Sequence, residues 1–165
     1  MKWVQLQINR CLLPTNRSVN KYKSSQDPNC SFCPNGNHLE QISTLLWTCP
    51  VVQDFWKIVE NILQLHSLGF KITRIEAIFG DINTRADSVE NTVLLLSREF
   101  IWIQKFTTKK LDETIFINFM KNQLKQLVHI AFIKNKSTEF LKYWDQILLF
   151  FNVDHSNLPF IDNMS

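Results

Sequence analysis

Glycine and proline are scarce in this sequence, which has three and five of them in 165 residues. An all-β sandwich with many tight turns needs more of both, because they supply the backbone angles of most turns. Long apolar runs are also lacking: stretches such as ILLFF and VLLL fall far short of the roughly 18 residues of a membrane-spanning helix. The amino end has no continuous apolar segment typical of a signal peptide. We therefore expect no membrane partner, an intracellular location in the nucleus or cytoplasm, and reduced thiols rather than disulfides.

Hydrophobic residues make up 45% of the chain, as in a globular protein, and they recur at helical spacing. This pattern predicts an all-α fold in three parts. A small CCHC-like zinc knuckle or loop module, with basic helices before it, fills residues 1–50. A helical bundle follows over 51–151, and 152–165 form a frayed polar tail. The expected helices cover 2–13, a short segment starting at Thr15 or Asn16, 50–68, 73–79, 87–106, 112–134 and 137–151.

Three cysteines and one histidine lie within CSFCPNGNHLEQISTLLWTCP, residues 30–50. The C-x-x-C spacing of Cys30 and Cys33 lets two thiolates reach one metal ion. Cys49 stands before a proline at the expected start of a helix, where the helix dipole favours a thiolate. His38 follows the turn-rich PNGN and can fold back as a fourth ligand. These four residues form the predicted zinc site, while inert thiols and a redox-active pair stay open as alternatives.

Positive charge gathers ahead of this segment. Residues 1–38 carry a net charge of +4 and residues 39–165 a net charge of −1. Such asymmetry favours a polyanionic partner, RNA or DNA, although a solvated helix face would look the same. The candidate phosphate contacts are Arg10, Arg17, Lys21 and Lys23. Further basic edges on helices are expected at Lys105, Lys109, Lys110, Lys121 and Lys125. Neighbouring acidic residues reduce the net positive charge of these edges.

Several motifs together resemble the C-terminal zinc-binding region of non-LTR (LINE-type) retrotransposon reverse transcriptases. They are CLLPTN, CSFC, Glu40 and LLWTCPVVQDFW, followed by a helical tail with AIFG, NTVLLLSREFIW and FLKYWDQIL. The resemblance covers about residues 1–150 and implies a metal-binding module that helps to grip template RNA or target DNA. The sequence departs from the family in two respects. Thr44 stands where the family has its metal-binding histidine, and the loop between Cys33 and Glu40 is about two residues longer than usual.

The resemblance implies a terminal fragment of a larger enzyme and not an enzyme in itself, because the aspartate pair of a polymerase palm does not occur in this sequence. The predicted function is non-catalytic, zinc-dependent binding of nucleic acid, with RNA favoured and no small-molecule substrate. The alternative is a metal-free helical relic or protein-interaction bundle without a specific ligand. The fourth ligand of the cysteine site distinguishes the two.

Overall fold

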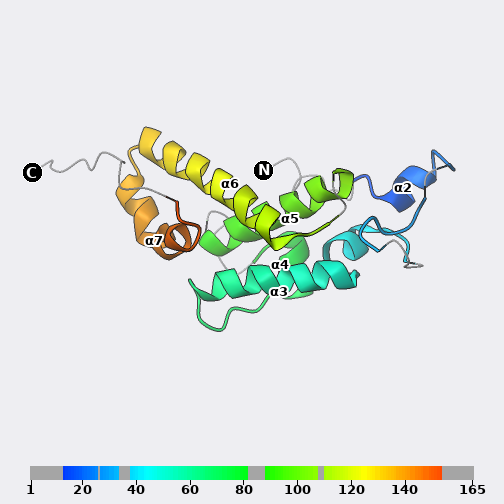
Figure 1. Ribbon diagram of the computed structural model, residues 1–165, viewed down its shortest axis with the longest axis horizontal. Coiled ribbons are helices and arrows are strands. Elements are labelled where there is room, and N and C mark those ends of the chain that lie inside the picture. Colours follow the sequence, from blue (N-terminus) through cyan, green and yellow to red (C-terminus); the bar gives the residue numbers. More distant parts are fainter. Residues whose placement is uncertain (1–12, 26, 34–37, 82–87, 108–109, 154–165) are drawn as a thin grey trace, which may run out of the picture. The chain divides into compact units, whose positions relative to one another are not determined.

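A computed structural model describes residues 13–25, 27–33, 38–81, 88–107 and 110–153 of the chain (Figure 1). These residues are mostly helical and contain no strand, so the prediction of a helical fold is confirmed for them. The elements are α2 (Asn16–Asn20), the π-helix η1 (Thr44–Thr48), α3 (Pro50–Gln64), α4 (Arg74–Phe79), α5 (Val89–Phe106), α6 (Glu113–Ile133) and α7 (Ser137–Phe150). None of these helices is both long and apolar enough to cross a bilayer.

The chain forms two compact units, Met1–Phe116 and Ile117–Ser165, with the boundary inside α6. The division predicted after residue 50 falls within the first unit. The helix expected over 2–13 lies outside the described residues except for Leu13, and so does the tail beyond residue 153.

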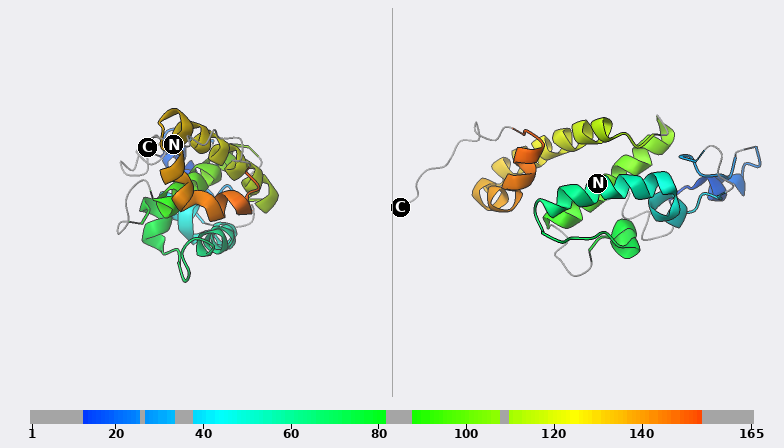
Figure 2. Two further views of the ribbon diagram at one scale, coloured as in Figure 1. Left: turned by 90° about the vertical axis from the view of Figure 1, so that its left-hand side faces the viewer. Right: turned by 60° about the horizontal axis from the view of Figure 1, so that its bottom comes forward.

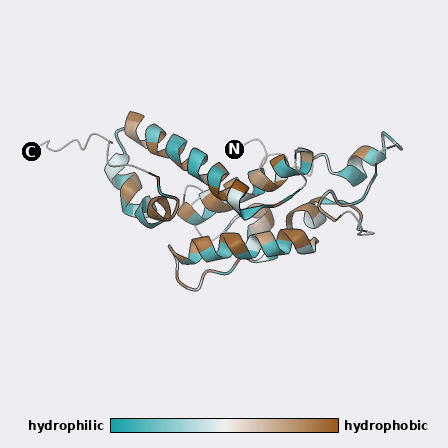
Figure 3. Ribbon diagram, in the orientation of Figure 1, coloured by the Kyte–Doolittle hydropathy of each residue, from teal (hydrophilic) through white to brown (hydrophobic). Residues whose placement is uncertain are grey.

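Two helices dominate the core of the first unit. α3 packs against α5 and η1, while α4 contacts η1 and α5 (Figures 1 and 2). Along α3 the ribbon alternates between hydrophobic and hydrophilic residues (Figure 3), and one face is buried. α5 buries residues on most of its circumference, as expected for a central helix. The buried face of α3 comprises Val52, Phe55, Trp56, Val59, Ile62 and Leu63.

Aromatic side chains hold this core together. The Phe55 ring centroid lies 5.5 Å from that of Phe100 and 4.8 Å from that of Phe116, and both approaches are in the range of favourable aromatic pairs. The Trp56 indole N–H donates a 2.6 Å hydrogen bond to the carbonyl of Leu46. This bond fixes α3 against η1, and through η1 it fixes the segment that carries the cysteines.

The helix starts follow the sequence signals closely. Pro50 occupies the first turn of α3 and Cys49 is its N-cap residue. Thr73 and Glu76 form the expected capping box of α4. The expected cap at Asp87 lies outside the described residues, and the N-cap of α5 is Ser88, whose hydroxyl accepts a hydrogen bond from the N–H of Asn91.

Asparagine takes the place of glycine at two helix ends in the second unit. Asn135 and Asn152 have φ angles of 53° and 49°, in the left-handed region. The N–H of the residue after each donates back to a carbonyl five residues earlier, from Lys136 to Ala131 and from Val153 to Leu148. This is the Schellman ending of a helix, and it explains how a glycine-poor chain stops α6 and α7 sharply.

A carboxylate ties the end of α3 to the start of α5. The Glu90 Oε1 atom accepts a 2.7 Å hydrogen bond from the Ser67 hydroxyl and lies 3.5 Å from His66 Nε2. Burial raises the pKa of Glu90, but the Ser67 bond, the residue's own backbone N–H and the His66 imidazole outweigh it. The net pKa lies below the usual 4.5.

Because the folded pKa is depressed, Glu90 stabilises the fold above its unfolded pKa, and this contribution is lost as the pH falls through the folded value. We expect Glu90→Gln to lower the stability to urea at neutral pH. The difference from the unaltered protein should shrink below about pH 4. Glu139→Gln, at an exposed position in α7, is the matched control. If the stability of the unaltered protein and of both variants changed with pH in parallel, this role of Glu90 would be contradicted.

Candidate metal centre and its polar anchor

Three thiols converge at one point. The Sγ atoms of Cys30, Cys33 and Cys49 all lie within 4.8 Å of one another, and those of Cys33 and Cys49 are 3.0 Å apart. Cys30 and Cys49 are only 4% and 1% exposed. Sulfur ligands of a tetrahedral zinc ion, with Zn–S bonds of about 2.3 Å, lie roughly 3.8 Å apart. The trio could therefore hold a metal ion, to which it would supply three ligands.

Backbone hydrogen bonds bring these sulfurs together. The N–H of Cys30 donates to the His38 carbonyl (2.9 Å), beside an isolated antiparallel bridge between Asn29 and Leu39. The N–H of Cys33 donates to the Cys30 carbonyl (3.3 Å) and closes the C-x-x-C turn. A short hairpin-like pairing thus presents two thiols to the third, which comes from the start of α3.

The hydrogen bond between Cys30 and Cys49 shifts the pKa values of the two thiols in opposite directions. A hydrogen bond with Cys49 favours the Cys30 thiolate and lowers the pKa of Cys30 to about 6, against the opposing effect of burial. The same hydrogen bond, together with burial, raises the pKa of Cys49. The N-cap position acts on Cys49 as expected, because the N–H of Val52 in the first turn of α3 favours its thiolate. The hydrogen bond with Cys30 and burial outweigh this effect in the metal-free trio.

The predicted fourth ligand lies apart from the sulfurs. His38 is exposed, and neither of its ring nitrogens belongs to the group of ligating atoms. Its backbone nevertheless adjoins the site, because its carbonyl binds Cys30. Thr44 is buried, and its hydroxyl donates to the Leu39 carbonyl at 3.1 Å. Thr44 therefore shapes the chain between Cys33 and Cys49 and offers no metal ligand.

The basic residues predicted to contact phosphate or to form exposed edges lie in different environments. Arg17, Lys21 and Lys23 are exposed on and just after α2, within the first unit. Arg10 lies outside the described residues. Near the carboxyl end of α5, Lys105 is not an exposed edge as predicted: it is only 3% exposed and bonds to a buried carboxylate.

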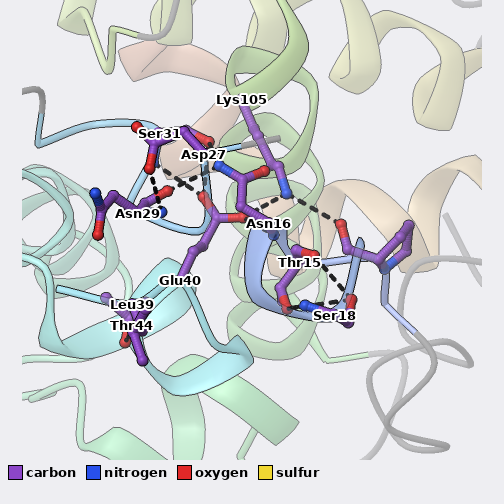
Figure 4. Close-up of polar contacts among 11 residues, drawn as sticks. Thr15, Asn16, Ser18, Asp27, Asn29, Ser31, Leu39, Glu40, Thr44 and Lys105 are labelled. Carbon is purple, nitrogen blue, oxygen red and sulfur yellow. Dashed lines mark hydrogen bonds and ion pairs between the residues drawn. The ribbon is translucent and has the colours of Figure 1, made fainter. Parts of the chain in front are cut away.

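That carboxylate, Glu40, is the centre of a buried polar cluster (Figure 4). It is fully buried and accepts four hydrogen bonds. Its Oε1 atom binds the N–H of Asn16 at 2.7 Å and Lys105 Nζ at 2.5 Å. Its Oε2 atom binds both the N–H (3.0 Å) and the hydroxyl (2.7 Å) of Ser31. Glu40 therefore links the turn that carries Cys30 and Cys33 to the start of α2 and to α5, and we call Glu40 with Lys105 the anchor pair.

The lysine of the anchor pair is held just as closely. Lys105 Nζ also donates to the Pro14 carbonyl at 3.0 Å and lies 5.1 and 5.2 Å from the ring centroids of Trp102 and Phe106. Burial lowers the pKa of Lys105, and Glu40 works against that shift. Sequence analysis missed this pair. The one local signal was Glu40 itself, an acidic residue between the C-x-x-C and an apolar run.

Comparison with models of protein families, with curated proteins and with solved structures found no match in any of the three.

Proposed function

We propose that this chain is a non-catalytic nucleic-acid-binding module, related to the zinc-binding region of retrotransposon reverse transcriptases, in which zinc braces a basic surface that binds RNA. Cys30, Cys33 and Cys49 would hold the ion as thiolates, and His38 is the candidate for the fourth position because its backbone already adjoins Cys30. The convergence of the three sulfurs is the observation that carries this proposal. A structural zinc ion contributes folding energy and no chemistry of its own here.

The charge distribution on the described surface supports a polyanionic ligand. Within the described residues before Cys49, Arg17, Lys21 and Lys23 are exposed cations, and Asp27 is the one exposed carboxylate. The other carboxylate there, Glu40, is withdrawn from the surface and neutralised by Lys105. The sequence-level excess of positive charge is therefore also an excess at the surface, as phosphate contacts require.

Binding of a single-stranded RNA to the zinc-loaded chain should depend strongly on salt. Three phosphate contacts give a slope of about −2 for log K against log [salt], or roughly a 20-fold loss of affinity between 50 and 200 mM salt. Fluorescence anisotropy with a labelled oligonucleotide measures this slope. Lys57→Ala, a change at an exposed lysine on α3 paired with Asp54, is the control and should leave the slope unchanged. A flat salt dependence, or no binding at all, would overturn the proposal.

A further inference from the structure

The first unit has a groove, and its walls come from two segments. Arg17, Ser18 and Lys21 form one wall, and Gln41, Ile42 and Ser43 form the other. The groove has a volume of about 360 Å³. This is near the lower end of the roughly 300–1,000 Å³ of small-ligand sites, so it suits one nucleotide unit rather than a folded partner.

The lining has the chemistry of a phosphate–sugar site. Arg17 and Lys21 are four residues apart, one helical turn, so their cationic groups project from the same side. No acidic side chain is among the described residues that line the groove. The hydroxyl of Ser43 and the amide of Gln41 also line the groove and can bond to a sugar or phosphate oxygen.

The anchor pair fixes the two walls relative to each other. Asn16, at the start of α2, donates its N–H to the Glu40 side chain, and the N–H of Arg17 donates to the Glu40 carbonyl at 3.3 Å. Gln41 follows directly in the chain. The cations and the opposite wall are thus held in place before any ligand arrives, which reduces the ordering cost of binding. The same contacts direct the nearest carboxylate away from the groove.

We infer that this groove is the phosphate-binding subsite of the module and holds one phosphate–ribose unit of a single-stranded RNA. Arg17 and Lys21 contact the phosphate, and Ser43 and Gln41 contact the phosphate–sugar edge. Lys23 does not line the groove, so its phosphate contact lies outside this subsite. This inference rests on the proposed function, since it names the part of the basic surface where the backbone sits.

A carboxylate placed in the groove tests the inference. Ser43→Glu should weaken binding of a labelled oligouridine to the zinc-loaded full chain by about tenfold or more, because like charges meet at close range. Ser24→Glu adds the same charge at an exposed position that does not line the groove. We expect it to weaken binding only about twofold. Lys21→Ala and Lys23→Ala form a second pair, and the loss should be clearly larger for Lys21. Far-UV circular dichroism and zinc content confirm that each variant is folded.

The outcomes separate the two proposals. If the unaltered chain binds the oligonucleotide and both acidic variants weaken it equally, the groove is not the subsite, while RNA binding stands. If the unaltered chain does not bind, the proposed function fails and the subsite falls with it. A loss confined to Ser43→Glu and Lys21→Ala supports the groove.

Discussion

Replacing Lys105 by methionine is expected to destabilise the first unit by about 3–5 kcal/mol, because it leaves Glu40 as a buried charge without its counterion. The Lys105 ammonium is the only cation that the structure places on this carboxylate within the described residues. The remaining donors, the Asn16 N–H and the Ser31 N–H and hydroxyl, carry no charge that could neutralise it. Urea denaturation followed by far-UV circular dichroism measures the loss.

Two further variants show whether charge is the cause. Lys57→Met removes a lysine whose side chain is 76% exposed and paired with Asp54, and it should change the stability by no more than about 0.5 kcal/mol. Adding Glu40→Gln to Lys105→Met should recover part of the loss, because a neutral amide needs no counterion. If Lys105→Met were no more harmful than Lys57→Met, the anchor pair would contribute nothing to the fold.

Substitution of any one of the three converging cysteines is expected to abolish tight zinc binding. Because each thiolate is one of three close ligands, Cys33→Ser or Cys49→Ser should lower zinc affinity by at least about 100-fold. Dialysis against a chelator of known affinity, followed by metal analysis, measures the zinc that remains per chain. The unaltered protein should retain one ion. Acidification should release it, because the thiols must lose their protons to bind the metal.

Ser24→Ala, a change at an exposed position outside the three thiols, is the control and should retain the ion. His38→Ala should weaken zinc binding without removing it, and the spectrum of the cobalt-substituted protein would report the change of ligand. An unaltered affinity in His38→Ala would exclude this imidazole as the fourth ligand and leave the three-thiol site standing. A folded, unaltered protein that takes up no zinc would favour the metal-free alternative.

The helices of the first unit were predictable because their signals are local. The three- and four-residue spacing of apolar residues in α3 and the capping box of α4 each depend on neighbours within a few positions. The signals that pointed to the three cysteine ligands are local as well. Cys30 and Cys33 share one tight turn, and Cys49 could be placed at the start of α3 because a proline follows it.

The anchor pair and the groove lined by Arg17, Lys21 and Ser43 had no such signals. Glu40 and Lys105 are 65 positions apart, and nothing near Lys105 in QKFTTKK distinguishes a buried lysine from an exposed one. The π-helical turn of η1, closed by the bond from the Cys49 N–H to the Thr44 carbonyl (3.2 Å), was not predicted either. The anchor pair and the groove both depend on which segments meet when the chain is packed.

The sequence by itself determined the helical class, the main helix starts and the set of thiols available to a metal, because hydrophobic spacing, caps and turn residues act over a few positions. Only the tertiary structure decided that the three sulfurs meet while His38 stays exposed, that Glu40 is neutralised from α5, and that Arg17, Lys21 and Ser43 line one groove. The physical reason is that burying a charge or assembling a site requires partners distant in the chain, and the same local sequence would suit a solvated loop.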